Sequence, residues 1–143
     1  MREGKKRLLL TIVTPERTAL SAKPVDSVTI PAHGGELGVL PGHAPLVTQL
    51  REGLLHYRDG HQKEVFAVLN GFAEVCGDRV LVLAEAAELA NEVSEERARQ
   101  AYQKAKDTLA MRGADMDLDS ATAALRRAAV RMKVAEFRKR HKQ

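Results

Sequence analysis

The chain changes character within residues 79–98, which read RVLVLAEAAELANEVSEERA. The stretch begins with a short apolar run typical of a β-strand, in which Val80 and Val82 alternate with Leu81 and Leu83. Because both alternating sets are apolar, we expect this strand to be covered on both of its faces.

The helical part begins at Leu89, from which the sequence is Ala-rich, lacks proline and contains a single glycine, Gly113. Ser94 is a good N-cap because its hydroxyl oxygen can accept a backbone N–H, and the two glutamates after it suit the positive end of a helix dipole. The sequence therefore predicts a β-rich body at residues 1–88 and a helical part at residues 89–143.

The two parts also differ in charge. Residues 1–88 hold 10 Lys and Arg against 11 Asp and Glu, whereas residues 89–143 hold 13 against 8. After Ser120 there are 8 basic residues and one acid, Glu136. Net charge informs about partners rather than about fold, so the pattern indicates a neutral body that docks and a cationic arm that meets an acidic partner. The arm is too small to be stable alone, and we expect it to rest on the body or on another protein.

Composition excludes several classes of protein. The single Cys76 allows no internal disulfide and suggests a reducing compartment. No apolar run approaches the ~18–20 residues of a membrane span, and the basic, then apolar start is too short for a signal peptide. Aromatic residues make up 3% of the chain, which disfavours nucleic acid as a partner. We find no phosphate loop, metal-ligand cluster or nucleophile–base pair, so the sequence predicts no catalytic residue, no metal and no enzyme.

Strand candidates follow one another at short intervals in the body. The strongest hairpin signals between them are Asp59-Gly60 and Gly77-Asp78. Many short strands without an intervening helix predict a β-sandwich or barrel. The candidate strands are residues 7–14, 25–30, 36–40, 45–49, 53–57, 64–69, 72–75 and 79–84.

Two helices are predicted in the arm, separated near Arg112-Gly113. The aspartates that follow favour capping of the second helix by Asp119 or Ser120, because the glycine and distant glutamate of a calcium loop are missing. The second helix carries two apolar stripes with cations between them, although a hairpin needs only one apolar face. One stripe is Ala121, Leu125, Ala128, Met132 and Ala135, and the other is Val130, Val134 and Phe137. The second stripe either packs on the body or engages another protein when the hairpin opens, and both can hold in different states.

Residues 35–46, GELGVLPGHAPL, combine two prolines, apolar residues and isolated polar groups. One interpretation is a strand, a proline-fixed turn and the next strand. The other is a turn that presents Glu36 and His43 to a partner, and composition leaves both open.

Taken together, these segments resemble the epsilon subunit family of bacterial and chloroplast F-type ATP synthases. The resemblance covers essentially the whole chain and implies an N-terminal antiparallel β-sandwich followed by an antiparallel two-helix hairpin. It implies a non-catalytic rotor subunit of the central stalk, which couples the proton-driven c-ring to the catalytic head. The segments that carry it are residues 13–16, 35–46, 70–75, 80–84 and 126–136.

The resemblance also implies partners and a location. The sandwich would bind the gamma subunit and the c-ring, and the second helix would inhibit ATP hydrolysis through the alpha and beta subunits. The chain would be a peripheral membrane protein on the cytoplasmic face of the bacterial inner membrane, with no membrane span of its own. The implied ring contacts are Glu36, Val39, Leu40 and His43. The implied inhibitory contacts are Arg126, Arg127, Val130, Arg131, Lys133, Val134 and Phe137.

Some family members bind ATP on the folded hairpin through an Ile/Leu-Asp-x-x-Arg-Ala motif. The matching stretch here is Val93-Ser94-Glu95-Glu96-Arg97-Ala98, in which serine replaces the aspartate. Glu88, Arg127 and Arg131 fall at matching positions, and Lys104 stands where an arginine is usual. Ser94 can serve as a cap alone, so two alternatives stay open: no cofactor, or ATP as a weak regulatory ligand.

Overall fold

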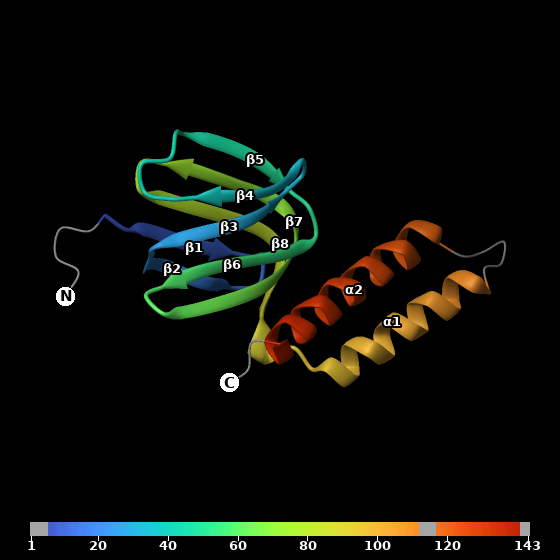
Figure 1. Ribbon diagram of the computed structural model, residues 1–143. Coiled ribbons are helices and arrows are strands. Elements are labelled where there is room, and N and C mark those ends of the chain that lie inside the picture. Colours follow the sequence, from blue (N-terminus) through green and yellow to red (C-terminus); the bar gives the residue numbers. More distant parts are fainter. Residues whose placement is uncertain (1–5, 112–116, 141–143) are drawn as a thin grey trace. The chain divides into compact units, whose positions relative to one another are not determined.

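The computed structural model describes residues 6–111 and 117–140 of the chain. The chain divides into two compact units, residues 1–89 and residues 90–143. The first is a β-sandwich and the second a pair of helices, which confirms the predicted fold class (Figure 1).

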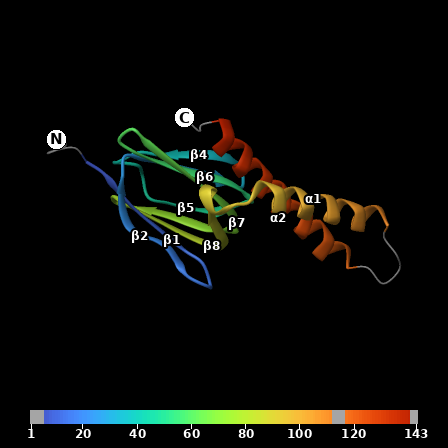
Figure 2. The ribbon, with the colours of Figure 1, turned by 90° about the horizontal axis from the view of Figure 1, so that it is seen from below.

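Within the described residues, eight strands build the sandwich in the order β2-β1-β8-β7-β5-β3-β4, and β6 pairs with both β3 and β7. All pairs of these described strands are antiparallel except β1 with β8, which is parallel. The long strand β7 pairs with β6 through its first half and with β5 through its second half, so it belongs to both layers (Figures 1 and 2). The strands are β1 (Leu8–Val13), β2 (Thr18–Val25), β3 (Ser27–Ala32), β4 (Gly35–Val39), β5 (Leu46–Leu50), β6 (Gly53–Asp59), β7 (Gln62–Cys76) and β8 (Arg79–Leu89).

Some strand predictions were wrong. The predicted strand 25–30 spans the end of β2 and most of β3, and the rest of β2 was missed. The predicted strands 64–69 and 72–75 are parts of β7, which continues through a bend at Asn70 (φ 37°) and Gly71 (φ 130°). A Cβ on Gly71 would lie 1.9 Å from the carbonyl oxygen of Leu83, so the bend brings two backbones together where only glycine fits.

The core lies between the layers and takes every second residue of most strands. In β8 it takes Val80, Val82 and Ala84, whereas Leu83 is 48% exposed. The prediction that this strand is covered on both faces is therefore wrong for residues 79–84. Consecutive burial occurs instead in β7, where all residues from 65 to 69 are buried.

Both predicted hairpin turns are confirmed. Strand β6 ends at Asp59 and β7 begins at Gln62, and Gly60 in the turn between them has a φ of 66°. Strand β7 joins β8 through Gly77, with a φ of 61°, and Asp78. A positive φ is easily adopted by glycine, which is why these two dipeptides were strong turn signals.

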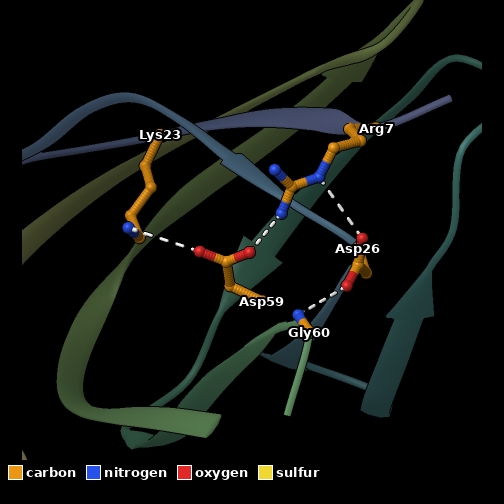
Figure 3. A network of polar contacts seen from close by, with 5 residues as sticks. All are labelled: Arg7, Lys23, Asp26, Asp59 and Gly60. Carbon is orange, nitrogen blue, oxygen red and sulfur yellow. Dashed lines mark hydrogen bonds and ion pairs between the residues drawn. The ribbon is translucent and has the colours of Figure 1, made fainter. Parts of the chain in front are cut away.

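A network of charged groups fastens the β6–β7 turn to the strands beside it (Figure 3). The guanidinium of Arg7, just before β1, donates to Asp59 and, from Nε, to Asp26 Oδ1 at 3.3 Å. Asp26 Oδ2 accepts the N–H of Gly60 at 2.7 Å, and Lys23 Nζ lies 3.7 Å from Asp59 Oδ2. The network therefore ties together the starts of β1 and β3, the end of β2 and the β6–β7 turn.

The helical unit consists of the short 3₁₀ turn η1 (Ala90–Glu92), α1 (Glu95–Ala110) and α2 (Leu118–Arg140). The predicted cap at Ser94 is confirmed, because its hydroxyl oxygen accepts the N–H of Arg97 at 3.3 Å. The cap of α2 is Asp117, not Asp119 or Ser120, since its carboxylate accepts both the N–H and the hydroxyl of Ser120. The predicted helix end at residues 112–113 lies outside the described residues.

Candidate functional site

The segment with the long motif contains β4 and the connection to β5. Glu36 is exposed and lies opposite Pro31, near the start of β4. His43 lies beyond the end of β4, where its ring Nδ1–H donates to the carbonyl oxygen of Ala44 at 2.7 Å and its backbone N–H donates to that of Leu40 at 3.1 Å. The structure thus places Glu36 within β4 and His43 in the connection that follows it.

The two apolar residues predicted to face the ring differ in exposure. Val39 is 1% exposed and belongs to the core, whereas Leu40 is 63% exposed. Successive residues of a strand point to opposite faces, so a side chain next to a core residue is turned outward. Of the two, only Leu40 offers apolar surface to a partner.

A group of large apolar side chains lies on the outer face of the layer formed by β1, β8, β5 and the second half of β7. Phe72 pairs with Leu83 on one side and with Gln49 on the other, and Leu83 pairs with Val13. In the neighbouring row Glu74 stands between Val47 and Leu81. Paired residues share a face of the sheet, so these side chains are neighbours. We call Val47, Phe72, Leu81 and Leu83 the outer apolar face.

Three of the four residues in the outer apolar face are largely exposed, which is unusual for large apolar residues that lie so close together. Val47 is 66% exposed, Phe72 56% and Leu83 48%. Exposed apolar residues scattered singly need no explanation, but contiguous ones mark an interaction site. Sequence reasoning missed this face because it expected β8 to be covered on both sides. The signal it passed over is Phe72, which stands between the polar Asn70 and Glu74 on the outward side of its strand.

A groove of about 310 Å³ lies between α1 and α2. Alanines line most of it and leave room because they lack longer side chains, while Lys104, Arg127 and Arg131 bring positive charge to it. The structure therefore gathers three of the residues with which the ATP hypothesis is concerned. Ser94, Arg97 and Ala98 lie at the start of α1 and do not line this groove, Val93 is buried, and Glu88 lies on β8 in the other unit.

The predicted inhibitory residues of α2 fall into two classes. Arg126, Arg127 and Lys133 are exposed, and Arg131 and Phe137 are half-buried. Val130 and Val134 are buried. In this conformation the cations are accessible to a partner, whereas the apolar pair is not.

The pKa of one histidine, His56, is shifted by its surroundings. Burial lowers the pKa of His56 below its ordinary value of 6.5, and the charges of Lys63 and Arg58 add to this effect while Glu36 opposes it. His56 lies opposite Thr29 of β3, in the same layer as β4. Among these charges, the carboxylate of Glu36 alone favours the protonated form of His56.

Two kinds of feature, a metal site and a membrane-spanning helix, are absent from residues 6–111 and 117–140. No three His, Cys, Asp or Glu side chains there are grouped as ligands of a metal ion. Neither α1 nor α2 combines the length and the apolar character that a membrane-crossing helix requires.

Comparison with known families gives a match along most of the sequence. The beta-sandwich domain of the ATP synthase delta/epsilon chain matches residues 7–90, and the long alpha-helix domain of the same chain matches residues 92–136. The chain belongs to the ATP synthase delta/epsilon family. The resemblance drawn from the sequence motifs is thereby confirmed.

The alignments with individual relatives cover nearly the full length of both chains. The ATP synthase epsilon chain of Symbiobacterium thermophilum is 49% identical over 127 residues, which are 88% of this chain and 91% of the relative. That of Desulforamulus reducens is 44% identical, over 89% of this chain and 96% of the relative. In both relatives the aligned region is long enough to include sandwich and helices.

Solved structures agree with the fold. A chain of the Euglena gracilis mitochondrial ATP synthase, a structure of OSCP, F1 and c-ring, matches with a TM-score of 0.79 at 25% identity, over 94% of this chain and 85% of that one. A chain of the Tetrahymena thermophila mitochondrial enzyme, from its central stalk and c-ring, matches with a TM-score of 0.61 at 15% identity and supports the fold alone.

Proposed function

We propose that this chain is a non-catalytic subunit of the central stalk of an F-type ATP synthase, where it helps to couple the c-ring to the catalytic head. Its family and its epsilon-chain relatives support this assignment. The observation that carries it is the outer apolar face, since an exposed apolar patch on a well-ordered sheet is suited to lasting contact with another subunit. The chain would accordingly be a peripheral membrane protein on the cytoplasmic face of the bacterial inner membrane.

The gamma subunit is the proposed partner of the outer apolar face. Burial of apolar surface contributes roughly 25 cal/mol per Å², so the exposed parts of Val47, Phe72 and Leu83 would contribute binding free energy, and Phe72 has the largest side chain of the three. The test is the affinity of the full chain for gamma by biolayer interferometry. Phe72→Asp should abolish binding, whereas Leu40→Asp, a matched change of an exposed apolar residue elsewhere, should preserve it. Binding of Phe72→Asp at the wild-type affinity would refute the assignment.

The c-ring is the proposed partner of β4 and the connection that follows it. Glu36 supplies an exposed charge, Leu40 apolar surface, and His43 a turn held by two hydrogen bonds. Val39 supports the strand from within the core. In the assembled complex, Glu36→Gln with Leu40→Ser should lower proton-coupled ATP synthesis while gamma binding is retained. Unchanged coupling would count against this contact.

Inhibition of ATP hydrolysis is the proposed role of α2, through contacts with the alpha and beta subunits. The exposed Arg126, Arg127 and Lys133 suit acidic partners, and Val130 and Val134 would take part only after the hairpin rearranges, because they are buried here. Removal of residues 119–143 should raise hydrolysis without preventing assembly. A truncated complex that assembles with unchanged hydrolysis would contradict this role.

A second candidate function is ATP sensing, which the cationic groove favours. Lys104, Arg127 and Arg131 converge on a space lined by small side chains, a suitable arrangement for a polyphosphate. Titration calorimetry of the chain with ATP and magnesium provides the test. Arg127→Ala should abolish saturable binding, whereas Arg126→Ala, an exposed neighbour that does not line the groove, should keep it. If no heat of binding appears at millimolar ATP, contacts with other subunits set the hairpin's position.

A further inference from the structure

The pairing of β1 with β2 is interrupted in its middle. Leu10 lies opposite Lys23 and Ile12 opposite Leu20, so the intervening residues of β2 outnumber those of β1 and form a bulge. Ala22 within the bulge has a φ of 47°, and its N–H donates to Thr11 Oγ1 at 3.0 Å. The hydroxyl of Thr11 thus takes the place of a regular backbone acceptor between the two strands. This hydrogen bond holds the irregular backbone of β2 at the edge of the sheet.

A hollow of about 270 Å³ lies beside this bulge. It is several times the roughly 30 Å³ that one water molecule occupies in the liquid, and it is large enough for an apolar side chain. Most of the residues around it are apolar, and Arg79 is the one charged residue among them. The lining consists of Leu9, Thr11, Ala22, Arg79, Val80 and Leu81.

The hollow is continuous with the outer apolar face. Leu81 belongs to both, and through the pairing of Thr11 with Leu81 and of Leu81 with Glu74 the hollow lies in the same row of the sheet as Val47. A subunit that covers Phe72 and Leu83 would therefore reach the hollow without a break in the contact.

Arg79 places a positive charge at the hollow, which favours a negatively charged group on whatever binds there. Its side chain is exposed, and it makes no ion pair within the described parts of the chain, residues 6–111 and 117–140. A guanidinium at the edge of an apolar contact favours a carboxylate, because the planar fork can donate two hydrogen bonds to it.

We propose that the hollow beside Ala22 receives one apolar side chain of the gamma subunit, and that Arg79 pairs with a carboxylate of gamma next to that side chain. The inference rests on the proposed docking of gamma to the outer apolar face. It adds an anchoring pocket and a charge contact, which would fix the register of gamma along the sheet, whereas a flat apolar face alone fixes it poorly.

The experiment measures the affinity of the full chain for the gamma subunit of the same complex. Leu9→Trp places bulk in the hollow and should weaken binding by about tenfold or more, whereas Leu9→Ala enlarges the hollow and should bind more tightly than Leu9→Trp. Arg79→Glu should weaken binding by about tenfold through loss and reversal of the charge, and Arg79→Lys should lose less. Thermal unfolding of each variant reports whether the sandwich is intact.

The result that overturns the proposal is distinct from the one that overturns gamma docking. If Phe72→Asp abolishes binding but folded Leu9→Trp and Arg79→Glu bind like the wild type, the outer apolar face binds gamma and the hollow is empty in the complex. If Phe72→Asp also binds like the wild type, gamma docking to this face is itself wrong. If folded Leu9→Trp binds gamma with the wild-type affinity, the hollow is not occupied by gamma, whatever the Arg79 variants show.

Discussion

His56 shows how the position of one side chain sets a dependence of stability on pH. Its folded-state pKa is lowered, first by burial and then by Lys63, so the folded protein binds the proton less readily than the unfolded chain does. The full stability is therefore present above the unfolded pKa of 6.5 and is lost as the pH falls from there toward the lower folded value.

The expected outcome is a difference between two proteins. Between about pH 7.5 and about pH 5.5 the free energy of unfolding, from urea denaturation, should fall more in the wild type than in His56→Gln. The carboxylates contribute the same background to both proteins and cancel in the comparison. Equal losses in the two proteins would show that His56 titrates alike in the folded and unfolded states.

Gly71 is a residue whose identity the backbone dictates. Gly71→Ala would place a Cβ 1.9 Å from the carbonyl oxygen of Leu83 at a φ of 130°, so we expect a loss of stability of about 3 kcal/mol or more. Gly38→Ala is the matched control, because nothing lies within 4 Å of its added Cβ, and it should change stability by less than about 1 kcal/mol. Similar unfolding midpoints for the two variants would mean that the bend in β7 relaxes easily.

At the scale of elements, sequence patterns predicted those strands that local turn chemistry delimits. Gly60 and Gly77 mark turns because they adopt positive φ, and Ser94 marks a helix start by its hydroxyl. Strand β2 escaped prediction because most of its residues are exposed or half-buried, with no regular apolar alternation. The sequence predicted separate strands on either side of Asn70-Gly71, which is a turn dipeptide, whereas pairing with β8 from Phe66 to Cys76 continues across the bend.

The candidate site was predictable to a similar degree. Periodicity on α2 indicated cations beside an alanine stripe, and the structure places two of them, Arg127 and Arg131, around a groove. The outer apolar face was not predictable in this way, since Leu83 and Val82 are equally apolar in sequence. Which of them is exposed depends on the layer opposite, and that is a tertiary property.

The end of α2 provides a prediction at the same scale. Arg138 Nη1 donates to the carbonyl oxygen of Ala90 in η1 at 3.0 Å, and the contact joins the two ends of the helical unit. Arg138→Ala removes one of two donors to this carbonyl, which still accepts the N–H of Val93 at 3.2 Å, so we expect a loss of about 1 kcal/mol and faster amide hydrogen exchange in the last turns of α2. Arg140→Ala is the control because it is exposed and only approaches Glu136 at 4.0 Å. Equal exchange in both variants would show that the contact does not restrain the helix.

For the whole molecule, the two units present surfaces of different physical kinds. The sandwich offers an apolar face, whereas the helical unit offers exposed cations. Salt screens exposed charges over about 8 Å at physiological ionic strength and leaves apolar burial intact. Assembly through the first surface and inhibition through the second should therefore respond differently to ionic strength.

We expect that raising potassium chloride from about 0.05 M to about 0.5 M relieves the inhibition of ATP hydrolysis severalfold while the chain stays bound to gamma. The control is the complex with the chain truncated after residue 118, which lacks nearly all of α2 and whose hydrolysis should respond to salt only through the catalytic subunits. The ratio of the two activities then isolates the helical contribution. A ratio that does not change with salt would mean that inhibition depends on the apolar residues Val130 and Val134 rather than on the exposed Arg126, Arg127 and Lys133. Loss of gamma binding over the same range would instead mean that charges, and not the outer apolar face, hold the sandwich in place.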